Sequence, residues 1–337
     1  MSRKKLNEFE LITKLTRSLP GDSRVIKGVG DDCAVLKQPG GKYLLATCDI
    51  QVDGVHFLSG VANPGAIGHK AVAVNVSDIA TMGGIPTFCL VSLVLPNDKD
   101  SDFVELLYDG IKTACSIYGV QIIGGNISSG KQLAVDIFMM GEVNPDELLL
   151  RSGAKPGDKL LVTGALGEAA AGLELIKNGA IILSETDRAD LLNKQLSPIA
   201  RLSESNLIAK SKLATSMIDI SDGLLGDVSH ICDESKVGVV IYEKQVPVLA
   251  SVTQVEKQLA NKSLSLAITG GEDYELLMTA SPDAAEKIIK IVKEKTGTDV
   301  SVIGEITPTD TGRWIFGSDG QMRPFAAEGW DHLAEDE

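Results

Sequence analysis

The chain has 337 residues, of which 44% are hydrophobic and 23% charged, and this composition excludes collagen-like, coiled-coil and disordered proteins. Its formal net charge of −14 repels nucleic acids and anionic membrane surfaces, and no basic patch in the sequence offsets that repulsion. The length predicts two domains, each large enough to bury its own hydrophobic core.

Hydrophobic periodicity in the first half predicts both helices and strands. Helices are expected near 7–18, 66–81 and 101–118, and strands near 43–48, 88–95, 120–125 and 133–143. Residues 144–158 then carry two prolines and two glycines among polar residues, which indicates a domain boundary. We therefore expect an N-terminal domain over 1–148 and a C-terminal domain over 149–337.

A second series of alternating elements follows the boundary. A strand is expected at 159–164, followed by a glycine-containing turn that opens a helix. Further helices are expected near 199–210, 223–235 and 283–294, and further strands near 237–242, 275–280 and 300–306. The pattern as a whole predicts a mixed α/β fold of two domains.

The cysteines and the N-terminus predict a cytoplasmic protein. Five scattered cysteines form no CxxC pair, which favours reduced core thiols over a disulfide framework and argues against zinc. The basic N-terminus is interrupted by Glu8 and Glu10, so we expect a helix there instead of a signal peptide. No apolar run reaches the roughly 18 residues that are needed to span a bilayer.

Two glycine-containing segments could bind phosphate. The segment GNISSGKQ, at 125–132, matches most of a P-loop, but Gln132 replaces the hydroxyl residue and a strand pattern follows, so a tight turn is favoured. Gly124 and Gly125 still allow backbone amides to approach an anion. Gly164 and Gly167 precede a helix, where we favour simple strand-to-helix geometry over a phosphate site.

Acidic residues recur beside glycine in five short loops. These are GVGDDCAVL (28–36), ATCDIQVDGVHF (46–57), NVSDIATMGG (75–84), IDISDGLLGD (218–227) and GGEDYEL (270–276). Each loop alone is more typical of a helix cap or a turn, and Asp222 before Gly-Leu-Leu fits that alternative. Gathered in space, the carboxylates would suit Mg²⁺, which usually serves a bound phosphate.

In this order, the five loops resemble the thiamine-monophosphate kinase family, which belongs to the superfamily of aminoimidazole ribonucleotide synthetase. The resemblance covers nearly the whole chain. Its other specific segments are HKAVAVNVSDIATMGGIP (69–86), RSGAKPGD (151–158) and the terminal GWDHL (329–333). The resemblance implies a synthetase-like fold, with an N-terminal sheet domain that binds ATP and metal and forms a homodimer, and a C-terminal α/β domain.

The resemblance also implies site residues. The implied metal ligands are Asp32, Thr47, Cys48, Asp49, Asp78, Asn126, Asp219 and Asp222, with Asp31 either as a ligand or as a residue that orients the loop. The implied ATP contacts are Gly125, Asn126, Arg151 and Ser221, with the Arg151 guanidinium as a fork for phosphate oxygens. The implied contacts to the thiamine phosphate are His56, Glu272 and Trp330, although a single Trp near a C-terminus is more often a packing residue.

Two of these positions depart from the family pattern. The family commonly has Thr at Cys48, and because a neutral thiol is a poor Mg²⁺ ligand, we expect any contact there from the backbone carbonyl. Many members carry Asp at Asn126, and the amide weakens a metal ligand by a full charge. We keep Asn126 as a binding residue.

The implied activity is direct in-line transfer of the γ-phosphoryl group of ATP to thiamine monophosphate, with several Mg²⁺ ions. Positioning and charge neutralisation carry the reaction, so no side-chain nucleophile is required. Two alternatives stay open. One is another ATP-dependent superfamily member that acts through a phosphorylated intermediate, and the other is a non-catalytic nucleotide-binding maturation scaffold.

Overall fold

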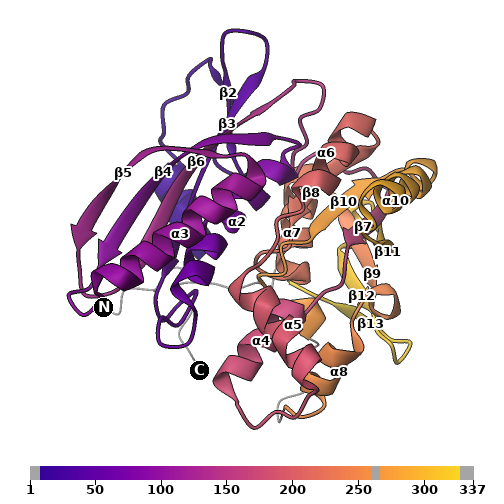
Figure 1. Cartoon of the computed structure of the whole chain (residues 1–337). Coiled ribbons are helices and arrows are strands. Elements are labelled where there is room, and N and C mark those ends of the chain that lie inside the picture. The colour runs from indigo at the N-terminus through magenta and orange to yellow at the C-terminus, as the bar shows by residue number, and fades with distance from the viewer. Residues whose placement is uncertain (1–7, 260–265, 327–337) are drawn as a thin grey trace, which may run out of the picture.

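The computed structural model describes residues 8–259 and 266–326, which form two separate β-sheets with helices packed on them (Figure 1). The elements of the first half are α1 (Glu8–Thr16), β1 (Val25–Lys27), β2 (Ala34–Lys37), β3 (Tyr43–Val52), α2 (Pro64–Thr81), β4 (Ile85–Leu95), α3 (Ser101–Tyr118), β5 (Gln121–Ser129) and β6 (Ala134–Val143). The strands form a six-stranded sheet in the order β1-β2-β3-β6-β4-β5.

Helix α2 is buried on nearly all sides because the first sheet, α3 and elements of the second half all pack against it. Its start is fixed by Asn63, whose side chain accepts the N–H of Gly65 at 2.8 Å, and by Pro64 in the first turn. Gly68 allows α3 to approach closely, since a Cβ there would lie 2.1 Å from the carbonyl oxygen of Leu107. The close packing holds the last turn of α2, which carries Asp78, against strand β3.

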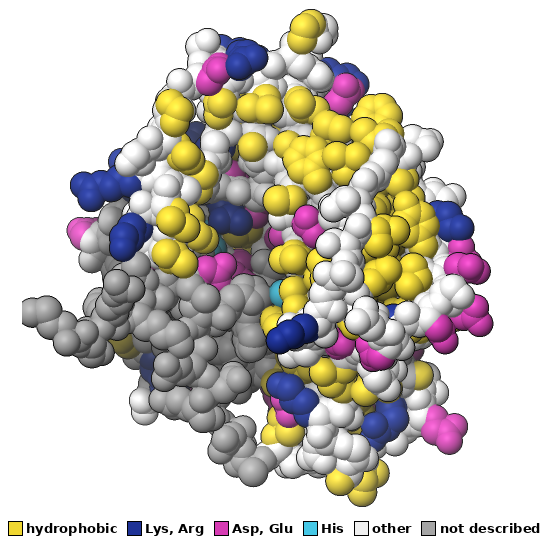
Figure 2. Space-filling view, turned by 90° about the vertical axis from the view of Figure 1, so that its left-hand side faces the viewer, with side chains coloured by type: hydrophobic (Ala, Val, Ile, Leu, Met, Phe, Trp, Pro, Cys, Tyr) yellow, Lys and Arg dark blue, Asp and Glu magenta, His cyan; other side chains and the backbone are white. Residues whose placement is uncertain are grey.

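The opposite face of the first sheet is exposed and apolar. Side chains alternate along a strand, so the residues that do not face α2 and α3 point outward. Ile50, Phe88, Leu90 and Phe138 are 36–50% exposed on these strands. Figure 2 shows hydrophobic side chains gathered in the upper right part of one face of the molecule. An apolar surface of this kind is typical of an interaction surface.

The second half contains a seven-stranded sheet in the order β13-β12-β9-β11-β7-β10-β8. Its elements are β7 (Lys159–Thr163), α4 (Glu168–Lys177), α5 (Glu185–Leu196), α6 (Leu202–Ser211), β8 (Ala214–Asp219), α7 (Leu224–Ser235), β9 (Gly238–Tyr242), η1 (Glu243–Gln245), α8 (Ala250–Glu256), α9 (Leu266–Thr269), β10 (Leu276–Ala280), α10 (Pro282–Thr296), β11 (Val300–Thr307), η2 (Thr309–Thr311), β12 (Arg313–Phe316) and β13 (Met322–Pro324). One hydrophobic cluster joins the sheet to α7 and α9, and another joins it to α6 and α10.

The mixed α/β architecture predicted from the sequence is confirmed, with three differences in detail. Residues 126–129 were expected in a loop but continue strand β5, because they pair with β4 in parallel. Helices α5, α8 and α9 and strands β1, β2, β8, β12 and β13 were not predicted. Four cysteines are buried free thiols as expected, whereas Cys48 is exposed. Within residues 8–259 and 266–326, no helix is both long and apolar enough to cross a membrane.

Candidate active site

A pocket of about 1950 Å³ lies between the two halves of the chain and is lined by residues of both. Figure 2 shows a hollow with acidic side chains at its wall. Most of the site residues named from the sequence line this pocket: Asp31, Asp32, Thr47, Cys48, Asp49, His56, Asp78, Arg151, Ser221, Asp222 and Glu272. The structure thus brings together residues that are up to about 240 positions apart in the sequence.

Three carboxylates meet beside the pocket, and we call Asp32, Asp78 and Asp219 the acidic cluster. Asp32 and Asp78 line the pocket, and Asp219 is buried next to them. One oxygen from each lies within 4.8 Å of the others. Asp32 precedes β2, Asp78 lies in the last turn of α2, and Asp219 ends β8. Asp78 therefore does not cap the start of a helix, which was the structural alternative for its loop.

Hydroxyl groups are prominent among the contacts of the acidic cluster. Thr47 Oγ1 donates to Asp78 Oδ2 at 2.6 Å, and Thr81 Oγ1 donates to Asp32 Oδ2 at 3.1 Å. The Ser77 hydroxyl donates to Asp219. Neutral donors orient the carboxylates without cancelling their charge.

Burial and mutual repulsion disfavour ionisation of the carboxylates in the acidic cluster. Burial raises the pKa of Asp78 well above its ordinary value, and Asp49, Asp219 and Asp32 raise it further. Burial and then Asp32 raise the pKa of Asp219 to about 7, although the Ser77 hydroxyl opposes this shift. Adjacent carboxylates resist ionisation together, so a cation between them would be favoured.

Arg151 is held at the edge of this cluster. Its Nη2 lies 2.6 Å and its Nε 3.2 Å from Oδ1 of Asp32. Its backbone N–H donates to Asp31 Oδ1 at 3.3 Å, and Lys27 Nζ lies 3.5 Å from Asp31 Oδ2. Burial, followed by Asp32, raises the pKa of Asp31 to about 6. Asp31 thus anchors the segment around Arg151 in addition to lying beside the cluster.

Successive side chains of strand β3 point to opposite faces of the sheet. Thr47 and Asp49 face α2, whereas the exposed side chain of Cys48 faces the other side of the sheet. Strand β2 pairs with β3 only as far as Ala46, so the edge of β3 beyond that point is open on this side. The Asp49 N–H on this edge donates to Asn75 Oδ1 at 3.0 Å. The C=O and N–H of one peptide group point in opposite directions, so the Cys48 carbonyl points away from this edge, towards β6. The structure therefore gives no support to the expected backbone contact at Cys48.

The loop that carries Ser221 and Asp222 is shaped by Asp227, a residue whose role the sequence analysis missed. Its Oδ2 accepts the N–H groups of Ser221, Asp222 and Gly223 at 3.1, 3.2 and 3.1 Å. Asp227 is 1% exposed in the first turn of α7. A carboxylate five residues after Asp222 at a helix start was the available signal.

His56 and Glu272 lie near each other at another part of the pocket and are joined by Lys70, while Gln195 binds Glu272. The sequence analysis missed Lys70 and Gln195. Lys70 Nζ lies 2.6 Å from Glu272 Oε1 and donates to the His56 carbonyl oxygen at 3.1 Å. Gln195 Nε2 donates to Glu272 Oε2 at 2.5 Å. The signal for Lys70 was a charged residue inside the apolar run of α2.

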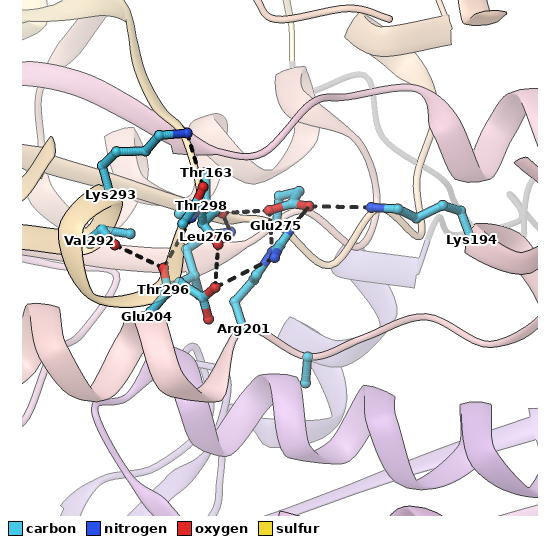
Figure 3. Close-up of polar contacts among 12 residues, drawn as sticks. Thr163, Lys194, Arg201, Glu204, Glu275, Leu276, Val292, Lys293, Thr296 and Thr298 are labelled. Carbon is cyan, nitrogen blue, oxygen red and sulfur yellow. Dashed lines mark hydrogen bonds and ion pairs between the residues drawn. The ribbon is translucent and has the colours of Figure 1, made fainter. Parts of the chain in front are cut away.

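Glu272 belongs to residues 270–275, which we call the acidic loop, and the other two carboxylates of this loop are compensated. Asp273 accepts the N–H groups of Gly167 and Ala169 at 2.6 and 3.1 Å, so it occupies the start of α4. This contact supports strand-to-helix geometry over a phosphate site at Gly167. Glu275 contacts Thr163, Arg201 and Lys194 (Figure 3).

Two residues named from the sequence are not brought into this pocket. Gly125 and Asn126 lie on β5, an exposed strand at the sheet edge, and neither is among the described residues that line the pocket. Trp330 lies outside the described residues. The P-loop alternative is also excluded by the fold, because Gly125 lies within a strand and a turn and another strand follow it.

Comparison with known proteins agrees with this arrangement. Residues 30–143 match the model of the AIR synthase related protein, N-terminal domain, and residues 155–316 match that of its C-terminal domain. A thiamine-monophosphate kinase from Buchnera aphidicola subsp. Acyrthosiphon pisum is 36% identical over 330 residues, which cover 98% of this chain and 99% of the relative. The chain belongs to the thiamine-monophosphate kinase family.

The chain also aligns with other members of the thiamine-monophosphate kinase family over nearly their full length. The protein from Escherichia coli K12 is 35% identical over 329 residues, which are 97% of this chain and 98% of the relative. A solved structure of AaThiL complexed with AMPPCP and TMP superimposes with a TM-score of 0.84 at 33% identity, over 98% of this chain and 99% of that chain. The family membership inferred from the five loops is confirmed.

Proposed function

We propose that the chain transfers the γ-phosphoryl group of ATP to the phosphate of thiamine monophosphate, giving thiamine diphosphate and ADP. The observation that carries this proposal is the acidic cluster beside Arg151, in a pocket shared by both halves of a chain of this family. The complex of a family member with AMPPCP, an ATP analogue, and TMP supports the choice of both substrates. The two alternatives, a phosphorylated intermediate and a non-catalytic scaffold, gain no support from these findings.

The residues present fit Mg²⁺. The donor set consists of carboxylate and hydroxyl oxygens, which hard divalent cations prefer, and no Lys or Arg of the described residues forms an ion pair with Asp78 or Asp219. Asp32, Asp78 and Asp219 would hold the ions, together with Thr47, Asp49 and Asp222. Bound there, Mg²⁺ supplies charge neutralisation for the phosphate oxygens.

The chain's own residues bind and orient the two substrates. Arg151 presents a guanidinium fork beside the acidic cluster, suited to the phosphate oxygens of ATP. Ser221 and Asp222 keep their place in the pocket wall because Asp227 binds their backbone amides. His56 and Glu272 would contact the thiamine part, and Trp330 belongs to the same proposal.

Transfer is direct in this proposal. The acceptor phosphate is largely ionised near neutral pH, so no strong general base is required, and alignment of the two substrates carries most of the rate enhancement. A single in-line displacement inverts the configuration at phosphorus, whereas a covalent enzyme intermediate retains it. Thiamine diphosphate formed from chiral γ-phosphoryl ATP is expected to show inversion, and retention would contradict direct transfer.

The experiment that tests the function is ADP release with ATP, Mg²⁺ and a panel of acceptors. We expect thiamine monophosphate to stimulate ADP release strongly, and thiamine and amide-containing acceptors to have little effect. Stimulation by another acceptor alone, or ATP hydrolysis that is independent of any acceptor, would contradict the proposal.

We also propose a cytoplasmic homodimer in which residues 1–148 form the ATP-binding and dimerisation domain and residues 149–337 the C-terminal domain. The exposed apolar sheet face supports the dimer, because Phe88 and Leu90 would otherwise contact water. Gly125 and Asn126 lie on the edge strand of the same sheet, so their contact with ATP is expected in the dimer. Sedimentation should give twice the chain mass of 35.6 kDa, and Leu90→Asp should give monomers. An active wild-type monomer would contradict this proposal.

A further inference from the structure

We propose that Lys70 is a positioning residue, which holds the Glu272 carboxylate across the boundary between the two halves of the chain and so fixes the substrate-binding wall. This inference rests on the function proposed above. It adds a residue that the family resemblance did not supply and that acts through another side chain.

Lys70 links the two residues expected to contact the thiamine phosphate. Its ammonium lies 2.6 Å from Glu272 Oε1 and donates to the His56 carbonyl oxygen at 3.1 Å. Lys70 is 2% exposed, whereas the Glu272 side chain is 24% exposed and lines the pocket. The lysine therefore lies behind the wall, and the carboxylate that it holds lies at the surface of the pocket.

A buried ammonium beside the apolar residues of α2 requires a reason. Removing it from water is costly unless it is paired, and apolar residues of similar volume often replace buried ion pairs without loss of stability. The neighbours of Lys70 along α2 include buried Ala71, Val72 and Ile67, so Leu or Met would suit the position as a packing residue. The structure thus gives Lys70 a role in placing Glu272.

The backbone of the acidic loop shows why Glu272 needs support. Glu272 and Tyr274 have φ values of 66° and 51°, in the left-handed region that non-glycine residues adopt only when their surroundings hold them there. The backbone N–H groups of Glu272 and Tyr274 bind the carbonyl oxygens of Ser221 and Ile220 at 2.8 and 2.9 Å. The loop is therefore held in an unfavourable conformation by specific contacts.

The described side-chain contacts of this loop come from different halves of the chain. Asp273 is bound by the start of α4, and Glu275 by Arg201 and its neighbours in the second half (Figure 3). Lys70 belongs to the first half, as does His56. Loss of Lys70 would leave the loop anchored through Asp273 and Glu275, and Glu272 bound to Gln195 of the second half. Glu272 would lose the contact that ties it to His56 in the first half.

The test compares Lys70→Met with Lys194→Met. Lys194 also pairs with the acidic loop, at 3.7 Å from Glu275 Oε1, but no described contact joins it to Glu272. Initial rates of ADP release are measured with each substrate varied in turn. We expect Lys70→Met to raise the KM for thiamine monophosphate about tenfold, as the loss of a charged hydrogen bond would, and to leave the KM for ATP nearly unchanged. Lys194→Met should leave both values nearly unchanged.

A double-mutant cycle shows whether Lys70 acts through Glu272. In the Glu272→Gln background, Lys70→Met should change the KM for thiamine monophosphate little further, because the group that it positions is already altered. Lys70→Arg, which keeps the charge, should recover part of the loss. If Lys70→Met does not fold, Lys70→Gln replaces it in the same measurements. Thermal unfolding shows whether each variant is folded.

Three outcomes separate this inference from the proposed function. A wild-type protein without thiamine monophosphate-dependent ADP release overturns the function, and this inference with it. An active wild type with an unchanged KM in the Lys70 variants overturns the positioning role alone. Equal increases in both KM values, or additive effects in the cycle, also overturn the positioning role.

Discussion

The acidic cluster and the acidic loop contain the same kinds of residue but differ in how their charge is compensated. Hydroxyl groups bind Asp78 and Asp219, and Arg151 contacts only Asp32 among the three. In the acidic loop, Glu272 meets Lys70, Asp273 meets two backbone amides, and Glu275 meets Arg201 and Lys194. The first region has charge left over for an external cation, whereas the second is compensated within the protein.

The difference predicts opposite consequences of removing one charge from each region. In the acidic cluster, loss of a carboxylate relieves repulsion in the absence of metal and removes a ligand in its presence. In the acidic loop, the same change leaves a buried cation without its partner, which is costly. Activity should therefore depend most directly on the first region, and stability on the second.

The largest effect is expected for Asp78→Asn. Turnover should fall at least about 100-fold, because a neutral amide is a weaker ligand for a divalent cation than a carboxylate. The thermal midpoint without Mg²⁺ should stay the same or rise, since repulsion with Asp49, Asp219 and Asp32 is reduced. Steady-state rates and calorimetric melting measure the two effects. Normal melting with a near-normal rate would contradict the metal-binding role.

The next effect is expected for Glu275→Gln. The free energy of unfolding should fall by about 3 kcal/mol, because Arg201 loses the carboxylate that its Nε and Nη2 contact at 2.7 and 2.6 Å. Urea unfolding measures the change. Glu142→Gln provides a matched control, since Glu142 pairs with Lys42 at an exposed site, and its loss should cost less than about 1 kcal/mol. Equal effects of the two changes would contradict a stabilising role for the Glu275 ion pair in the acidic loop.

A smaller effect concerns pH. Burial raises the pKa of Asp273 to about 7, although the amides of Gly167 and Ala169 oppose the shift. The folded protein then binds this proton more tightly than the unfolded chain, so the Asp273 contribution to stability is present near pH 4 and is lost as pH rises towards 7. Relative to Asp273→Asn, the wild type should lose up to about 1.4 kcal/mol per pH unit in this range. Urea unfolding at pH 5 and 7 measures it, and parallel profiles would contradict the shift.

The sequence predicted the elements whose own residues determine them. Helix α3, at Ser101–Tyr118, follows its hydrophobic periodicity and ends at Gly119, which adopts φ 72°. Helix α5 was missed because it is mostly polar and buries only Leu191 and Gln195. The end of β5 was missed because Gly, Asn and Ser have low strand propensity, and pairing with β4 holds them in the sheet.

The sequence identified the carboxylates of the candidate site but not the residues that bind them and balance their charge. The resemblance gave Asp78 and Glu272, whereas the partners that distinguish the two regions are distant in sequence. Arg201 is 74 residues from Glu275, and Asp32 is 119 residues from Arg151. No local pattern specifies such contacts, because they arise when the two halves of the chain pack together.

The central claim is that the acidic cluster binds the cation which serves ATP, and the acidic loop does not. Calorimetric titration of AMPPCP, with and without Mg²⁺, tests it most directly in the wild type, Asp78→Asn and Glu275→Gln, at a temperature where all three are folded. We predict tight, Mg²⁺-dependent binding by the wild type and Glu275→Gln, and weak binding by Asp78→Asn under both conditions. Mg²⁺-dependent binding by Asp78→Asn that equals the wild type would contradict the claim.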